Sequence, residues 1–204
     1  MTGYHNYIKD FPRRCRDILA IAGKPALSRG REVTLTLMVA SAGFIVPYER
    51  LKPDNGWGNH PSGDGKRFYD AAAELKLVLD QPFLSSRFWT KTSSTWHVGR
   101  LASLTGEPDS WEGLRERKPI SREKKVYTVL NVIRNALAHG NIWTQGNPIE
   151  SIIFVIAVAK VVPVFAFLSV APREFRDFLE NWFDFLTDLD IPPELVFEVL
   201  RDAA

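Results

Sequence analysis

Cysteine is almost absent from this sequence, because Cys15 is the single one among its 204 residues. One cysteine excludes an internal disulfide framework and any zinc site that needs several cysteines. Histidine is also scarce, and the four histidines lie too far apart to show the spacing of metal ligands: His5, His60, His97 and His139. From these absences we expect neither a bound metal nor a cofactor.

Three motifs that are common in enzymes are missing as well. The sequence has no G-x-x-x-x-G-K-[ST] phosphate loop, no G-x-S-x-G nucleophile turn and no H-E-x-x-H zinc motif. The first 30 residues lack the apolar segment and cleavage site of a secretory signal, so we expect a cytoplasmic protein. The longest apolar run, 151–170, has the length of a membrane span, but Lys160 and Pro163 interrupt it. We therefore expect no membrane partner.

The composition is that of a globular protein, with 45% hydrophobic and 25% charged residues, and the length fits one domain over 1–204. The charges are unevenly distributed. Up to Arg134 there are 22 basic and 14 acidic residues, whereas from Asn135 onward there are 4 basic and 10 acidic ones. This asymmetry indicates either an anionic partner on the basic side of the molecule or an acidic C-terminal element that packs against a basic body.

Apolar residues recur at helical spacing through most of the chain. The ranges that show this pattern are 11–22, 31–47, 66–80, 122–139, 173–188 and a short terminal stretch after Pro192-Pro193. Range 31–47 is apolar nearly all round, which is typical of a helix in the middle of a bundle, and Pro47 should end it. The pattern predicts a mainly α protein, an up-and-down helical bundle.

Three regions depart from the helical pattern. Residues 52–65 are dense in Gly, Pro, Asn and Asp and predict a loop insertion. The tract 81–119 is irregular, with a short helix expected near 94–104. Many residues of 151–170 are β-branched, which favours a short β-hairpin of two buried strands turning near Lys160, with a buried helix as the alternative.

Range 122–139 is the clearest amphipathic helix and carries the candidate site. Opposite its apolar stripe lie five polar residues at steps of four, three, four and four: Lys124, Thr128, Asn131, Asn135 and His139. Arg134 lies on the neighbouring row, from where its long side chain can reach the same face. Arginine binds phosphate oxygens with a planar fork, and histidine exchanges protons near neutral pH, so this face suits acid–base cleavage of a phosphodiester. The structural alternative is that Arg134 and His139 cap the helix or pair with carboxylates.

Other candidate features have ordinary structural explanations beside the functional ones. Trp89, Trp96 and Trp111 suit stacking on nucleic-acid bases or a place in the core. Cys15, beside three arginines, is either a thiol of lowered pKa or a small buried hydrophobe. We favour the structural interpretation for both features.

The run Ile133–Gly140 (IRNALAHG) resembles the signature of the HEPN superfamily of small helical nucleotide-binding and ribonuclease domains. That signature is an arginine, a polar residue, several variable residues and a histidine, and Arg134, Asn135 and His139 match it with four residues between Arg and His. A weaker likeness covers Arg31–Leu51, which ends in ASAGFIVPYERL and is similar to the N-terminal bundle helix of a stand-alone subgroup.

The resemblance implies a metal-independent endoribonuclease that works as a homodimer, with the two motifs meeting in one cleft. His139 would handle the proton of the ribose 2′-hydroxyl or of the leaving oxygen, and Arg134 would hold the scissile phosphate. Asn135 would orient the histidine or the phosphate. Asn131 and Lys124 are the candidate substrate-binding residues. RNA is then the expected partner, and the resemblance adds an antitoxin or regulatory protein, as in toxin–antitoxin and phage-defence systems. The alternatives are a non-catalytic HEPN-like module that binds a nucleotide or protein, and a helical scaffold without a ligand.

Overall fold

A computed structural model describes residues 7–51, 66–89, 95–159 and 164–191. Its helices, in chain order, are α1 (Tyr7–Leu27), α2 (Glu32–Gly43), α3 (Ile45–Leu51), α4 (Lys66–Leu79), α5 (Glu112–Arg115), α6 (Val126–His139) and α7 (Pro172–Asp188). Its strands are β1 (His97–Leu101), β2 (Lys118–Pro119), β3 (Ile142–Gln145), β4 (Ser151–Ala159) and β5 (Val164–Val170). Two short 3₁₀ helices, η2 (Phe83–Ser85) and η3 (Pro108–Ser110), lie in the tract that the sequence marks as irregular.

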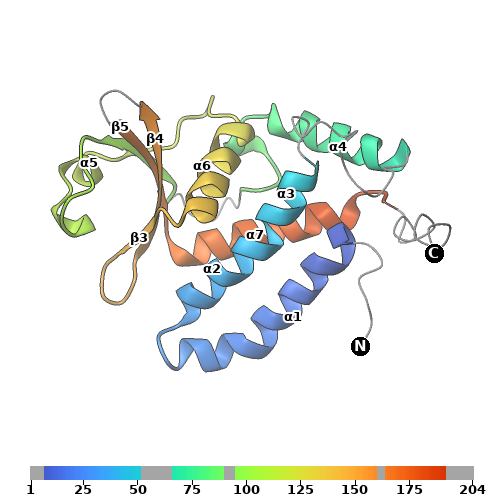
Figure 1. Ribbon diagram of the computed structural model, residues 1–204, viewed down its shortest axis with the longest axis horizontal. Helices are drawn as coiled ribbons and strands as arrows, with labels where there is room; N and C mark the ends of the chain where they lie inside the picture. The colour runs from blue at the N-terminus through green and yellow to red at the C-terminus, as the bar shows by residue number, and fades with distance from the viewer. Residues whose placement is uncertain (1–6, 52–65, 90–94, 160–163, 192–204) are drawn as a thin grey trace, which may run out of the picture.

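The strands form one five-stranded antiparallel sheet in the order β2-β1-β5-β4-β3. Figure 1 shows the sheet with α5 on one side and α6 and the other helices on the opposite side. The alternation of β4 explains this layering, because Ile152 and Phe154 join the core formed with the helices, whereas Ile153 and Val155 pack with Trp111 on the other face. The molecule is therefore a mixed α/β protein, and the prediction of a mainly helical bundle is wrong.

The hairpin favoured by the sequence is present within this sheet. β4 pairs with β5 in antiparallel register, with Ile152 opposite Val170, so the helical alternative for 151–170 is wrong. The turn near Lys160 falls outside the described residues. Two strands alone are marginally stable in water, and β1 and β3 extend the sheet on either side. The short helix expected near 94–104 is likewise wrong, because β1 occupies that segment between β5 and β2.

Helix α7 lies at the centre of the helical layer. Three aromatic residues of α7 pack against rings from other segments: Phe178, Trp182 and Phe185. Their partners are Phe44 just before α3, Tyr48 of α3 and Phe88 after η2. Trp182 also donates its indole N–H to the carbonyl of Gly43 at 3.1 Å. A Cβ on Gly43 would lie 2.8 Å from Sγ of Cys15, so only glycine allows α1, α2 and α7 to approach this closely.

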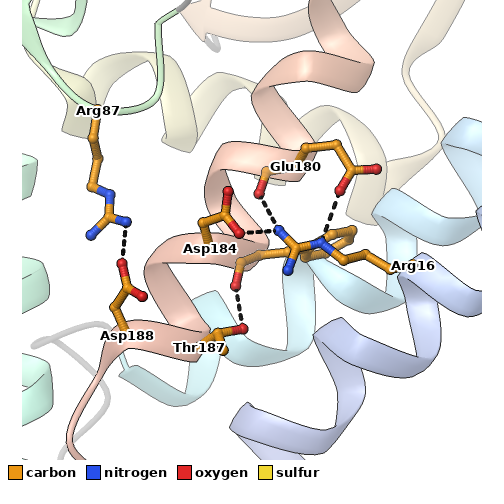
Figure 2. A network of polar contacts seen from close by, with 7 residues as sticks. Arg16, Arg87, Glu180, Asp184, Thr187 and Asp188 are labelled. Atoms are coloured by element: carbon orange, nitrogen blue, oxygen red, sulfur yellow. Dashed lines mark hydrogen bonds and ion pairs between the residues drawn. The ribbon is translucent and has the colours of Figure 1, made fainter.

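The outer face of α7 is acidic and is neutralised by arginines from elsewhere in the chain (Figure 2). Arg16 of α1 donates from Nε to the Glu180 carboxylate at 2.9 Å and from Nη2 to the Glu180 carbonyl at 2.8 Å. The same Nη2 pairs with Asp184, and Arg87 pairs with Asp188. These contacts confirm that an acidic C-terminal element packs against the basic body, which accounts for part of the charge asymmetry.

The apolar stretch 31–47 is not one buried helix. The chain forms α2 and α3 with Phe44 between them, and Pro47 lies inside α3 instead of ending the helix. α2 is also partly at the surface, because Met38 is 67% exposed, and Val46 of α3 is 40% exposed. The prediction of a helix in the middle of a bundle is therefore wrong. Met38 and Val46 leave apolar surface uncovered in this structure of one chain, and we call these two residues the apolar strip.

The remaining helix predictions are confirmed in position. α4 and α7 match the expected ranges 66–80 and 173–188 to within one residue. α6 ends where expected but begins at Val126, inside the expected range 122–139, and α1 extends beyond the expected 11–22 at both ends, from Tyr7 to Leu27. The predicted loop over 52–65 and the helix after Pro192-Pro193 fall outside the described residues. Among the described helices, none combines the length and apolar character needed to cross a bilayer.

Candidate functional site

Helix α6 is held between the sheet and the other helices by its apolar side. The stripe expected from the sequence is buried, together with Ala136: Val126, Val129, Leu130, Ile133 and Leu137. The helix ends at Gly140, whose φ of +69° is left-handed and whose N–H bonds the carbonyl of Ala136. A side chain is strained in that conformation, so Gly140 fixes where His139 leaves the helix.

Arg134 is the centre of a chain of polar contacts on α6. Its Nε pairs with the carboxylate of Glu49 on α3, and its Nη1 donates to Oδ1 of Asn135. The amide nitrogen of Asn135 in turn donates to Oδ1 of Asn131 at 3.1 Å. We call these four residues the Arg134 network. The structure thus brings together three of the predicted site residues and adds a carboxylate.

The Arg134 network fixes the guanidinium without using all of its donors. The side chains of Arg134 and Glu49 are 26% and 27% exposed, so the pair lies at the edge of the interior. Within the described residues, no hydrogen bond engages Nη2 of Arg134. The guanidinium is therefore held in place while the two N–H groups of Nη2 stay available. Charged N–H donors of this kind bind phosphate oxygens.

His139 lies apart from this network in the single chain. It is the last residue of α6 and is exposed, and it makes no hydrogen bond or ion pair in the part of the chain that the structure describes. It lies five positions after Arg134 in the helix, which amounts to about 7.5 Å along the axis and about 140° around it. Arg134 turns toward α3, so the two side chains do not converge on one spot within one copy.

Lys124 is separated from the network at the other end of α6. It precedes the first residue of the helix and lines, together with Thr128, a cavity between α6 and the sheet. The polar face read from the sequence is therefore divided in three: the Arg134 network in the middle, His139 at the C-terminal end and Lys124 at the N-terminal end.

Glu49 is the member of the site that sequence reasoning missed. It lies 85 residues from Arg134 in the chain, so no local spacing connects the two. The available signal was its place in IVPYERL, where it is the only acidic residue after a long apolar run, inside the stretch of weaker family likeness.

Two other candidate features are structural. Cys15 is buried, and burial raises the pKa of its thiol to about 11, so a thiol of lowered pKa is excluded. Trp96 and Trp111 are 1% and 5% exposed and belong to the two cores, which excludes stacking on nucleic-acid bases for both. Among the described residues, no group of three or more His, Cys, Asp and Glu side chains has an arrangement that would hold a metal ion.

Comparison with known proteins places this helix in a family context. Neither the curated proteins nor the solved structures contain a significant match to the chain. The model of the HEPN pEK499 p136 family matches residues 1–192, which include both segments of likeness, 31–51 and 133–140. HEPN domains indicate a nuclease or nucleotide-binding role. Because the match spans nearly the whole sequence, the chain belongs to the HEPN pEK499 p136 family.

Proposed function

We propose that the protein is a metal-independent endoribonuclease that works as a homodimer. In this proposal Arg134 of one copy and His139 of the partner subunit act on the same RNA phosphodiester. The observation that carries the proposal is the state of the two motif residues: Arg134 is fixed by Glu49 and Asn135 with Nη2 free, and His139 is exposed and without a partner among the described residues.

The chemistry follows from what these groups can exchange. The imidazole of His139 takes the proton of the ribose 2′-hydroxyl, and the 2′-oxygen attacks the adjacent phosphorus. The bond from phosphorus to the 5′-oxygen breaks, and water supplies the proton that the departing oxygen requires. Arg134 stabilises the negative charge that develops on the phosphate oxygens. The products are a 2′,3′-cyclic phosphate and a 5′-hydroxyl.

The two asparagines serve as positioning residues in this account. Asn135 accepts a hydrogen bond from Nη1 of Arg134 and so sets the plane of the guanidinium. Asn131 accepts a hydrogen bond from the amide nitrogen of Asn135. This bond fixes the Asn135 amide in the orientation in which its oxygen faces Arg134. Loss of either should disturb Arg134 without removing a charge from the site.

Two features support the homodimer. Within one copy, Arg134 and His139 point to different sides of α6, so a second copy is the simplest way to unite them. The apolar strip of Met38 and Val46 is exposed, and Val46 lies one helical turn before Glu49 on α3. Exposed apolar surface beside a site is typical of a protein interface. An antitoxin or regulatory protein stays a prediction.

One observation favours a second function, a non-catalytic HEPN-like module that binds a nucleotide or a protein. Glu49 neutralises part of the charge of Arg134, as in a structural ion pair. In that case ligand binding survives His139→Gln and no RNA is cleaved.

The test is cleavage of a single-stranded RNA in a buffer that contains a chelator. We expect wild-type protein to release products with 2′,3′-cyclic phosphate ends, and Arg134→Ala and His139→Ala to be slower by at least about a hundredfold. Arg29→Ala removes an exposed cation from the turn between α1 and α2 and is the matched control, which should keep full activity. Equal cleavage by all four proteins would indicate a contaminating nuclease and contradict the proposal.

A further inference from the structure

The described part of the chain contains a cavity of about 610 Å³ between the first turns of α6 and the sheet. This volume lies within the range of sites for small molecules. Thr128, Val129 and Val132 line it from α6, and Ile156 of β4 and Leu168 of β5 line it from the sheet. Leu168 also belongs to the core that the sheet shares with the helices, so the cavity is on the face of the sheet that carries them. Lys124 and Thr128 lie at the N-terminal end of α6, whereas His139 is its last residue.

The mouth of the cavity is basic and its charges are not matched. Arg100 of β1, Lys118 of β2 and Lys124 line it together with a single carboxylate, that of Glu116. Within the described residues, none of these four side chains forms an ion pair or a side-chain hydrogen bond. The neighbouring Lys125, by contrast, pairs with Asp80 at 3.0 Å outside the cavity. Three cations against one carboxylate leave a net positive charge facing the cavity.

The interior of the cavity is apolar. Val129, Val132, Ile156 and Leu168 present aliphatic side chains, and Val158 at its edge is 53% exposed. Val129 and Leu168 are each only 2% exposed, so the open aliphatic surface belongs to Val132, Ile156 and Val158. Burial of apolar surface is favourable by roughly 25 cal/mol per Å², so a ligand with a flat apolar part would gain by covering these three side chains. A cationic mouth over an aliphatic floor fits a molecule with an anionic end and a flat, apolar body.

We infer that this cavity binds a nucleotide unit, with the phosphate at Arg100, Lys118 and Lys124 and the base on the aliphatic floor. The hydroxyl of Thr128 and the carboxylate of Glu116 are placed to bind ribose or base edges. The unit comes from a strand of RNA, in which case the inference rests on the proposed function and extends the substrate along α6, or from a free nucleotide.

The experiment measures binding of a fluorescent single-stranded oligonucleotide whose 2′-oxygens are methylated, so that no 2′-oxygen can attack. Lys124→Glu reverses a charge at the mouth, and Thr128→Trp fills the mouth from an exposed helix position without changing charge. We expect each to weaken binding at least tenfold. Arg122→Glu, an exposed charge reversal two residues from Lys124 but outside the cavity, is the matched control and should stay within twofold. Melting temperatures verify that all three variants fold.

Competition identifies the source of the unit. If adenosine monophosphate displaces the oligonucleotide, the cavity accepts a free nucleotide; if it does not, the source is the RNA strand, and either result supports the inference. Equal binding by wild type and both cavity variants would overturn it, as would displacement by inorganic phosphate at the same concentration as the nucleotide. Cleavage of unmodified RNA by the wild-type protein is measured separately. A protein that cleaves no RNA but loses oligonucleotide binding in both cavity variants would contradict the nuclease proposal and support this inference, so the two failures are distinguishable.

Discussion

Three acidic residues of α7 are paired with arginines, whereas two basic residues at the ends of α6 have no ionic partner in the described part of the chain. On α7, Glu180 and Asp184 are both engaged by Arg16, and Asp188 is engaged by Arg87. Along α6, His139 and Lys124 have no ion pair within the described residues. The paired carboxylates of α7 lie where the helix contacts another segment of the chain. In the described residues, His139 and Lys124 instead face open surface and a cavity, respectively, and have no ionic partner. We infer that the three paired carboxylates of α7 belong to the architecture, and that His139 and Lys124 are available to a ligand.

Arg134 is intermediate between these two groups and makes the comparison specific. It is paired, as the α7 charges are, but its Nη2 has no hydrogen bond among the described residues. Arg16 likewise leaves its Nη1 without a hydrogen bond among the described residues, but its charge is matched by two carboxylates, those of Glu180 and Asp184. In the same described part of the chain, Arg134 is paired only with the carboxylate of Glu49. We therefore expect Arg134 to act in ligand binding and Arg16 in stability.

The largest effect is expected from a charge placed in the apolar strip of α2. Met38→Arg should convert the proposed homodimer to a monomer and lower RNA cleavage at least about a hundredfold, because the partner's His139 is lost from the site. Leu77→Arg is the matched control, since Leu77 is 71% exposed on α4, and it should stay dimeric and active. Sedimentation and cleavage assays measure both. A Met38→Arg protein that remains an active dimer would place the interface elsewhere.

A smaller effect is expected when Arg16 and Arg100 are replaced in turn, because one should affect stability and the other ligand binding. Arg16→Met keeps the length of the side chain but removes its bonds to Glu180 and Asp184 and its place 5.7 Å from the Phe183 ring. Because these groups are partly exposed, we expect the free energy of unfolding to fall by about 1–2 kcal/mol, with oligonucleotide binding unchanged. Arg100→Met should show the reverse, with weaker binding and nearly unchanged stability. Denaturant titrations and binding assays compare the two, and identical behaviour would remove the distinction drawn here.

The smallest effect concerns the buried thiol beneath the α1–α7 contact. Burial raises the pKa of Cys15 to about 11. Between pH 9 and 11 the unfolded chain loses this proton while the folded chain keeps it, so rising pH favours unfolding. By pH 10 the term should cost about 1 kcal/mol of stability. The measurement is the free energy of unfolding of wild type minus that of Cys15→Ala, which should decline from pH 8 to pH 10; a constant difference would contradict the burial of the thiol.

Sequence reasoning succeeded where the signal was local. The stripe of α6, its end at Gly140 and the β4–β5 pair all follow from spacing, a glycine and β-branching within one segment. The reasoning failed where a segment is stabilised by partners distant in the chain. β1 and β2 are short and carry little alternation, and they are strands because they line up beside β5. A periodicity argument has no means of detecting that.

The candidate site shows the same division. Asn131, Arg134 and Asn135 were grouped correctly because they share one side of one helix. The position of the guanidinium, however, depends on Glu49, and the distance between Arg134 and His139 depends on which way that guanidinium turns. Sequence spacing places the two residues about 140° apart around α6, and we expected the long side chain of Arg134 to reach across to the face of His139. The pairing with Glu49 turns the guanidinium toward α3 instead, which is what makes the second copy necessary in the proposed mechanism.

The most direct test of the account mixes two inactive proteins. Arg134→Ala and His139→Ala are unfolded and refolded together, so that about half of the dimers combine one chain of each kind. In such a dimer one of the two sites regains both Arg134 and His139, from different chains. The account predicts that cleavage of RNA returns to roughly a quarter of the wild-type rate, while each variant refolded alone stays inactive. No recovery in verified mixed dimers would contradict a site that is shared between two copies.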